Sequence, residues 1–309
     1  MINEYLAYRQ TLGYSKHQEK VLVRFDSYCT EHHPDIKTIT KEAARGWINY
    51  EKTHGYGDIE SKVSAVRMLA LYMGGGAYIL PTTNVPKKVK YVPYILTDEE
   101  LTRFFATVDN IKGKTKNSIK LMFPTLLRLL YTCGLRPNEV RTIKRDNINL
   151  TTGEIFIEKT KNHKERIVVM SDDMLKQCRK YDVIRGIENP LSEYFFVCED
   201  GVPVTAIQLK DTFRLIWRQA NHGVPLKKLP RLRAYDLRHR FASTVLQKWL
   251  CEKRDLYTML PYLRAYMGHE NFYSTAYYIH LLPENLLCSS GVDWKAIDSV
   301  NPKESIWKN

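Results

Sequence analysis

Apolar residues in the first part of the chain recur at the spacing of helix faces and are separated by short polar segments. Phe25 and Tyr28 belong to one such helix, Thr40 is placed to cap the next, and a later apolar segment ends at Gly74. Residues three or four apart share a helix face, while threonine and glycine favour helix starts and helix ends respectively. The pattern predicts a small helical module over residues 1–80.

A basic segment, 81–95, interrupts this periodicity. It has three prolines and three lysines but no acidic residue, which is typical of an extended linker that lies near phosphates. Helical periodicity resumes after Thr97, a predicted cap, and the second long apolar helix ends at Gly134. We therefore predict a second domain over 96–285, followed by a tail over 286–309.

Within the second domain the apolar period changes from helical to alternating. A polar turn at 160–165 separates two segments in which apolar residues alternate as in paired strands, namely Ile155 and Ile157, then Ile167 and Val169. Alternation of this kind on both sides of a polar turn is typical of a hairpin. A short strand is also predicted at 194–197. The predicted fold class is α+β, mainly helical with a small β-sheet.

The chain is strongly basic. Its 309 residues carry a formal net charge of +13 and its isoelectric point is near 9.3, which favours a polyanionic partner because neutralised phosphates release counterions. The densest positive stretch, 210–240, crosses Pro225 and Pro230, so it is not one helix face. A solvated surface and a phosphate-facing surface both fit it. The predicted DNA-binding residues are Lys87, Lys88, Lys90, Lys227, Lys228, Arg231 and Arg233.

Other patterns narrow the class of protein. The six cysteines are scattered and include no C-x-x-C pair, which indicates reduced thiols. The first residues lack the apolar core of a signal peptide, and no apolar run approaches the roughly 18 residues of a membrane span. No acidic cluster suits a metal nuclease. We predict a cytoplasmic protein whose leading partner is nucleic acid.

Cleavage of a phosphodiester without a metal needs a nucleophile, an acid for the leaving oxygen and fixed cations, preferably arginines, for the phosphate charge. The chain offers such residues in several places: Arg136 after a helix end, Lys161 in the turn, Arg238 at a helix start, and His269 shortly before a pair of tyrosines. Taken singly, each is better explained as a surface, capping or core residue.

A catalytic role becomes the better interpretation when the residues are taken together, because they lie in four stretches in this order: YTCGLRPNEVRTIKRDNI, TKNHKERIVVMS, YDLRHRFAS and MGHENFYSTAYYIH. Together they resemble the tyrosine recombinase, or phage integrase, family, including its Xer-like members. The LTDEEL stretch and the helical module with its basic linker resemble the start of that family's catalytic domain and its core-binding, SAM-like domain. The resemblance spans nearly the whole chain. It implies a C-shaped clamp around double-stranded DNA, no metal or other cofactor, and a nucleoid-associated protein of a prokaryotic or mobile-element host cell.

The resemblance assigns roles to the charged residues. Arg136 and Arg238 match the two arginines that clamp the scissile phosphate, and Glu139 matches the acid that supports the first of them. His269 matches the histidine that hydrogen-bonds the phosphate, while His239 is expected to pack against or orient its neighbours.

The hairpin lysine and one departure from the family complete this set. Lys161 matches the lysine that donates a proton to the departing 5′ oxygen, with Lys164 as the nearby alternative. Where the family most often has histidine, three residues before the second arginine, this chain has Tyr235. A tyrosine can donate a hydrogen bond to phosphate but is a poor general base at neutral pH. Tyr235 is therefore expected to act as a donor, or else the site is weakened.

The adjacent tyrosines are distinguished by the same resemblance. The family's ending, T-x-x-Y-x-H, matches Thr275, Tyr278 and His280, so Tyr278 is the predicted nucleophile and Tyr277 the predicted core residue. Neighbouring helical residues point about 100° apart, so only one of them can face the phosphate. Ser274 or Thr275 is expected to cap the short helix and leave Tyr278 near its positive end.

The mechanism that the resemblance implies is two transesterifications. Tyr278 attacks a phosphate to give a 3′-phosphotyrosyl link and a free 5′ hydroxyl, and a 5′ hydroxyl of a partner strand then attacks that link, through a Holliday junction and without ATP. Such enzymes typically act as four protomers on two DNA sites, with a partner recombinase or an accessory DNA-bending protein in some systems. The tail 286–309 is expected either to contact a neighbouring protomer or to fold back on its own domain.

Three alternatives stay open at this point. A type IB topoisomerase or a hairpin-forming telomere resolvase shares the same chemistry, and a DNA-binding protein with an impaired site would explain Tyr235. The biological setting is integration of a mobile element, transposition or resolution of chromosome dimers. Integration is preferred, because Tyr235 suggests a divergent lineage.

Overall fold

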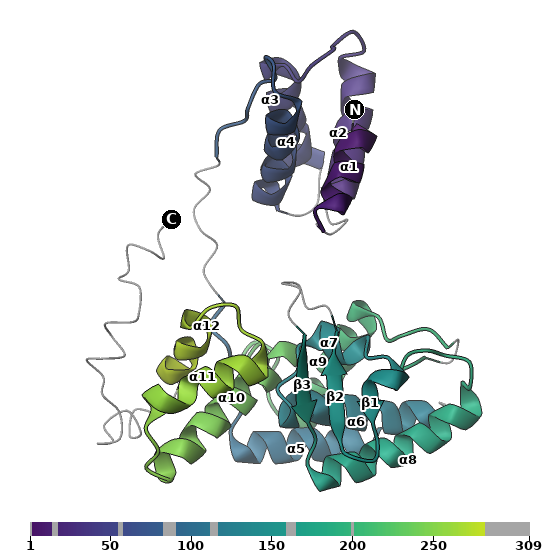
Figure 1. Ribbon diagram of the computed structural model, residues 1–309, viewed down its shortest axis with the longest axis vertical. Helices are drawn as coiled ribbons and strands as arrows, with labels where there is room; N and C mark the ends of the chain where they lie inside the picture. The colour runs from purple at the N-terminus through teal and green to yellow at the C-terminus, as the bar shows by residue number, and fades with distance from the viewer. Residues whose placement is uncertain are drawn as a thin grey trace. The chain divides into compact units, whose positions relative to one another are not determined.

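The computed structural model describes residues 2–13, 18–54, 58–82, 91–111, 117–158, 165–198 and 201–281. The chain separates into two compact units, Met1–Tyr91 and Val92–Asn309 (Figure 1). Each unit has its own apolar core.

The first unit is helical in its described part. Its helices are α1 (Ile2–Thr11), α2 (Glu19–His32), α3 (Lys41–His54) and α4 (Ile59–Met73). The predicted cap of α3 is confirmed, because the hydroxyl of Thr40 accepts a hydrogen bond from the Ala43 N–H at 3.1 Å. The predicted end of α4 is also confirmed, since Gly74 follows it with a φ of 60°. Trp47 and Phe25 pack edge to face in the core between the helices.

The second unit combines helices with a small sheet, which confirms the predicted fold class. Its elements are α5 (Asp98–Asp109), α6 (Asn117–Thr132), α7 (Pro137–Arg141), the 3₁₀ turn η2 (Arg145–Asn147), β1 (Ile148–Asn149), β2 (Glu154–Ile157), β3 (Arg166–Val169), α8 (Asp172–Glu188), α9 (Ala206–Ala220), α10 (Ala234–Cys251), α11 (Leu256–Met267), α12 (Tyr273–Ala276) and the 3₁₀ turn η3 (Tyr277–Leu281). Thr97 caps α5 and Pro137 opens α7, both as predicted.

The three strands form an antiparallel sheet in the order β1-β2-β3. Ile155 pairs with Val168, and both side chains are buried. Ile167 and Val169 flank Val168 and therefore point away from the core, with 58% and 55% of their surface exposed. The alternating period is confirmed, but on β3 it is Val168, and not the two more conspicuous apolar residues, that enters the core.

The predicted strand at 194–197 is wrong. Tyr194 and Val197 form only isolated bridges, with Lys144 and Pro203 respectively. The two phenylalanines between them are fully buried in the core of the unit. Apolar content predicted burial correctly here, but a run of apolar residues does not distinguish a strand from an irregular buried segment.

The packing of the helices brings distant segments of the second unit together. Helix α6 packs against α8 and α10, α10 packs against α11 and η3, and α11 contacts β3. Figure 1 shows α10, α11 and α12 grouped on one side of this unit, with the sheet beside them. Two glycines in the left-handed region end the helices that meet here: Gly134 after α6, with a φ of 58°, and Gly268 after α11, with a φ of 65°.

Substitution of Gly134 tests how tightly this junction is packed. A Cβ at Gly134 would lie 2.7 Å from Cε1 of Phe241 and still closer to Cδ1, whereas a Cβ at Gly153, which also has a positive φ, would meet its nearest neighbours at 3.6 Å. Because Gly134→Ala adds overlap to backbone strain, we expect it to lower the free energy of unfolding by about 3 kcal/mol, against about 1 kcal/mol for Gly153→Ala. Equilibrium urea unfolding measures both, and equal losses would contradict the packing argument.

Candidate active site

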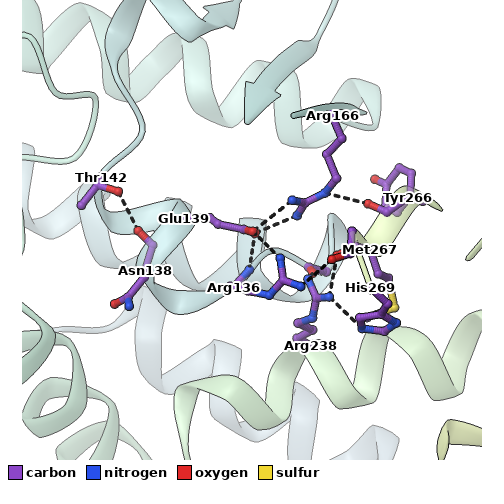
Figure 2. A network of polar contacts seen from close by, with 11 residues as sticks. Arg136, Asn138, Glu139, Thr142, Arg166, Arg238, Tyr266, Met267 and His269 are labelled. Carbon is purple, nitrogen blue, oxygen red and sulfur yellow. Dashed lines mark hydrogen bonds and ion pairs between the residues drawn. The ribbon is translucent and has the colours of Figure 1, made fainter. Parts of the chain in front are cut away.

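Arg238 lies at the centre of the site. It stands on the second turn of α10, and its side chain is fully buried, at 0% exposed. Nη1 donates to the Gly134 carbonyl at 2.5 Å, and Nη2 donates to the Met267 carbonyl at 2.7 Å (Figure 2). These carbonyls belong to the ends of α6 and α11, where helix dipoles are negative and stabilise a cation. Burial lowers the pKa of Arg238 from its ordinary value, and the two helix ends offset part of that cost.

His269 is held between Arg238 and Thr275. Its Nε2 lies 2.9 Å from Nη2 of Arg238, and its Nδ1 lies 2.7 Å from Oγ1 of Thr275. A guanidinium can only donate, so Nε2 must accept and Nδ1–H must donate to the threonine. Burial, followed by the charges of Arg238 and Arg136, lowers the pKa of His269 to about 3. The ring is therefore neutral in solutions near pH 7.

Arg136 is fixed at the start of α7. Its backbone N–H and its Nη1 donate to the two carboxylate oxygens of Glu139, at 2.8 and 2.7 Å, and its Nη2 donates to the Gly268 carbonyl at 2.6 Å. Arg166, the first residue of β3, binds the same carboxylate from the other side (Figure 2). Glu139 thus joins two arginines that are 30 residues apart in the sequence.

Arg166 was not among the predicted site residues. It lies in the stretch TKNHKERIVVMS, but an arginine at the start of a strand usually extends into solvent, so the sequence held no signal of its burial. The structure shows its side chain only 8% exposed. A carboxylate on α7 and the turn after α11 enclose it, and neither is close to it in the sequence.

Tyr278 lies in η3 against the histidines. Its side chain is 2% exposed, and its ring stacks on that of His269, with centroids 5.7 Å apart and planes at 18°. Residues three apart in a helical segment share a face, so Tyr278 lies on the same side as Thr275, the partner of His269. Burial raises the pKa of Tyr278 to about 12, although the nearby charge of Arg238 lowers it.

Two predictions about this segment are wrong. Tyr277 is not the core residue, because it is only partly buried whereas Tyr278 is almost fully buried. Neither Ser274 nor Thr275 caps α12: the Ser274 N–H donates to Oδ1 of Asn271 at 2.9 Å, and Thr275 is engaged by His269.

The expected position of Tyr278 near the positive end of this helix is also wrong. Helix α12 is a single turn that ends at Ala276, and Tyr278 lies beyond its C-terminal end. The positive environment of Tyr278 therefore comes from Arg238 and not from a helix dipole.

His239 separates Tyr235 from Tyr278. Its ring centroid is 5.0 Å from that of Tyr235 and 5.4 Å from that of Tyr278. Its buried Nδ1 has no hydrogen-bond partner within the described ranges. Burial, followed by the charges of Arg233 and Arg238, lowers the pKa of His239 to about 4, so this ring is also neutral near pH 7. The position at which the sequence departs from the usual family pattern thus belongs to the same cluster as the predicted nucleophile.

The profile of the phage integrase family matches residues 95–285, which include all the residues of this cluster. The chain belongs to the phage integrase family of tyrosine recombinases. One relative, y4rE, a candidate integrase/recombinase of Sinorhizobium fredii, is 32% identical over 163 residues, 52% of this chain and 51% of that relative. The tyrosine recombinase XerC of Staphylococcus carnosus is 25% identical over 286 residues, 88% of this chain and 89% of XerC.

A solved structure shows the same fold. XerH, a site-specific recombinase bound to its palindromic difH substrate in a post-cleavage complex, matches with a TM-score of 0.61 at 20% identity, over 89% of this chain and 78% of that chain. The arrangement of helices and hairpin around the arginine and tyrosine cluster is therefore one that a phage integrase fold provides.

Some predicted residues of this family member lie outside the described ranges. They are Lys161, Lys164, the linker lysines 87, 88 and 90, and the tail 286–309; the same holds for the side chain of His280, whose backbone lies in η3. Lys227, Lys228, Arg231 and Arg233 are exposed. Arg231 and Arg233 line a cavity of about 440 Å³ between α7, α9 and the start of α10, together with Tyr235.

The described residues were also compared with the features of membrane spans and metal sites. None of their helices is long and apolar enough to cross a membrane. Among the same residues, no group of three or more histidine, cysteine, aspartate or glutamate side chains could hold a metal ion.

The carboxylate of Glu139 predicts a pH dependence of stability. Burial disfavours its ionisation, but hydrogen bonds and charge from Arg166, with hydrogen bonds from Arg136, prevail and lower its pKa from 4.5 to about 2. A lowered folded-state pKa stabilises the fold fully above pH 4.5, by about 3 kcal/mol, and this contribution is lost as the pH falls from 4.5 towards 2.

We therefore expect the free energy of unfolding of wild type to exceed that of Glu139→Gln by an amount that is constant above pH 5 and shrinks below pH 4.5. Denaturant unfolding at a series of pH values measures the difference. Glu99→Gln, at an exposed carboxyl of α5, is the control and should differ little from wild type at every pH. If the difference in unfolding free energy between wild type and Glu139→Gln did not change with pH, the lowered pKa assigned to Glu139 would be contradicted.

Proposed function

We propose that this protein is a site-specific DNA recombinase in which Tyr278 forms a 3′-phosphotyrosyl intermediate, and that strand exchange proceeds through a Holliday junction without metal or ATP. One observation carries the proposal. The ring of Tyr278 is buried against a neutral His269 whose Nε2 accepts from the buried cation Arg238. The charge of Arg238 lowers the pKa of Tyr278 against the effect of burial, so a phenolate that forms where a phosphate is to be attacked is stabilised by a fixed nearby cation.

In the proposed first step the oxygen of Tyr278 bonds to phosphorus and gives its proton to solvent, while the bond from phosphorus to the 5′ oxygen breaks and that oxygen takes a proton from Lys161. In the second step the oxygen of a 5′ hydroxyl of the partner strand bonds to phosphorus and returns a proton to Lys161, while the bond from phosphorus to Tyr278 breaks and the tyrosine oxygen takes a proton from solvent. Arg136 and Arg238 stabilise the charge on the non-bridging oxygens, with His269 and Tyr235 as hydrogen-bond donors and Glu139, His239 and His280 in support.

His269 supports this scheme with a specific constraint. It can donate to a phosphate only through Nε2, and that atom now accepts from Arg238. Donation therefore requires a proton on Nε2. It can come from protonation of the ring, which the negative phosphate would favour by offsetting the arginine charges, or from a shift to the neutral tautomer in which Nδ1 accepts from the Thr275 hydroxyl. Phosphate binding is therefore expected to change the protonation state or the tautomer of His269.

The substrate and assembly belong to the same proposal. The net charge of +13 and the exposed basic residues Lys227, Lys228, Arg231 and Arg233 support binding to double-stranded DNA. XerH is a site-specific recombinase that was solved on its DNA substrate. We propose that four protomers act on two DNA sites in the cytoplasm of a prokaryotic cell, and that the reaction integrates a mobile element.

No observation favours the other functions over this one. Topoisomerase and telomere-resolvase activities use the same cleavage step, and the order of strand transfer separates them from recombination. A DNA-binding protein with an impaired catalytic site would fit the departure at Tyr235, but it would not require the remaining catalytic residues to lie together. Here Arg136, Arg238, His269 and Tyr278 come together in one cluster, which supports an active enzyme.

The test is covalent trapping on nicked suicide substrates taken from DNA that flanks the gene. Cleavage next to a nick releases a short strand, so the phosphotyrosyl link cannot be reversed. We expect a protein–DNA adduct on one strand, joined through a 3′ phosphate with a free 5′ hydroxyl on the released fragment. If the protein bound such DNA but formed no adduct, the proposal would be overturned in favour of a DNA-binding protein with an impaired catalytic site.

A further inference from the structure

The inference concerns Arg166 and rests on the proposed function. Arg166 makes three hydrogen bonds with good geometry: Nη1 and Nη2 donate to Oε1 and Oε2 of Glu139 at 3.0 and 2.7 Å, and Nε donates to the Tyr266 carbonyl at 2.9 Å. Both members of the ion pair are only 8% exposed. Figure 2 shows Arg166 on one side of the carboxylate and Arg136 on the other.

The charges of this trio do not cancel. Glu139 is ionised, since its pKa is about 2, so two guanidinium groups and one carboxylate leave one positive charge. Without Arg166, the pair of Arg136 and Glu139 would be neutral as a unit. A buried, neutral pair attracts a phosphodiester far less than a net cation does, because screening inside the protein is weak.

Arg166 also shapes the turn that carries His269. Its guanidinium lies against Gly268, where a Cβ would come within 3.0 Å of Nη1 and 3.2 Å of Cδ. The Gly268 carbonyl accepts from Arg136, and the Tyr266 carbonyl accepts from Arg166. The two arginines therefore fix the turn from 266 to 268 from both sides, one residue before His269.

We propose that Arg166 is a positioning residue that neutralises Glu139, so that the charge of Arg136 acts on the scissile phosphate instead of on its own carboxylate. Arg166 touches neither the nucleophile nor, on this proposal, the DNA. It acts through Glu139 and Arg136. Its charge offsets that of the Glu139 carboxylate, which would otherwise repel an anionic substrate beside the first clamping arginine.

The test uses charge restoration within the trio. Arg166→Met removes one positive charge and leaves the trio neutral, and the double variant Glu139→Gln/Arg166→Met restores the single net positive charge. With full-length protein on the nicked suicide substrate, we expect Arg166→Met to slow adduct formation about 100-fold and the double variant to recover about 10-fold of that loss. If Arg166 were needed only for folding, the double variant would form the adduct no faster than Arg166→Met.

A second measurement isolates the phosphate charge. A methylphosphonate at the scissile position removes the negative charge of the non-bridging oxygens, so the net charge of the trio should matter little there. On that substrate we expect Arg166→Met to react within about 3-fold of wild type. Arg128→Met is the matched control, since Arg128 forms a two-bond pair with Asp109, at 2.7 Å for each bond, on α6 away from the site. It should cleave both substrates as wild type does.

Three outcomes would overturn the inference. They are a folded Arg166→Met protein that cleaves at the wild-type rate, a double variant no faster than the single one, and an Arg166→Met loss of equal size on both substrates. Thermal unfolding shows whether each variant is folded. A wild-type protein that binds the DNA but forms no adduct would overturn the proposed function itself, and this inference with it, and that result is distinct from the other three.

Discussion

Tyr278→Phe is expected to abolish the covalent protein–DNA adduct, by a factor of about 10⁴ or more, while Tyr277→Phe retains it. The phenol oxygen is the atom that bonds to phosphorus, so its removal leaves no nucleophile at that position. Tyr278 is the tyrosine that stacks on His269. The ring of Tyr277 lies edge-on to that of Tyr278, with ring centroids 6.1 Å apart, and Tyr277 is only partly buried.

The two variants control for each other. Each removes one hydroxyl from neighbouring residues of η3, so both should retain the fold and bind the nicked substrate as wild type does. The adduct is quantified by gel electrophoresis under denaturing conditions, and the modified residue is identified by peptide mapping. An adduct that vanished with Tyr277→Phe but persisted with Tyr278→Phe would show that the assignment of the nucleophile is wrong by one residue.

Arg238→Lys is expected to slow adduct formation about 1,000-fold and also to destabilise the second unit. Arg238 satisfies the Gly134 carbonyl, the Met267 carbonyl and Nε2 of His269 at once. A lysine ammonium is a single point on a flexible stem and cannot span all three acceptors, so at least one buried acceptor would lose its partner, at a cost of about 1–3 kcal/mol.

Arg240→Lys is the matched control for this variant. Arg240 lies on the same helix two residues later, its side chain is 12% exposed, and it pairs with the exposed Asp98 away from the site. We expect it to cleave at a rate close to that of wild type. Adduct formation and urea unfolding are measured for both variants. An Arg238→Lys protein that kept both its stability and its rate would contradict the role given to the buried guanidinium.

Much of the fold could be predicted from local sequence. The caps Thr40 and Thr97, the helix ends at Gly74 and Gly134 and the start of α7 at Pro137 depend on neighbouring residues only. Their preferences follow from the conformations and hydrogen bonds that each residue type allows. At these positions the tertiary contacts agree with the local preferences, so the caps and helix ends lie where they were expected.

The predictions that failed depended on contacts that the local pattern of side chains does not encode. The sequence could not show that Val168, and not Ile167 or Val169, faces the core, because the register with Ile155 and the packing on the helices decide it. Thr275 was expected to cap a helix, but His269 engages its hydroxyl. A side chain with two available roles takes the one that its three-dimensional neighbours stabilise more.

The sequence by itself determined the family, because four ordered motifs resemble those of the tyrosine recombinases, and that resemblance predicts Arg136, Arg238, His269 and Tyr278 as a set. Only the tertiary structure decided how those residues contact one another. Arg136 binds a carbonyl 132 residues away and Arg238 one that is 104 residues away. The burial of Arg166 against Glu139 arises in the same way. Contacts across such separations depend on how whole helices pack, and no local pattern of side chains encodes that packing.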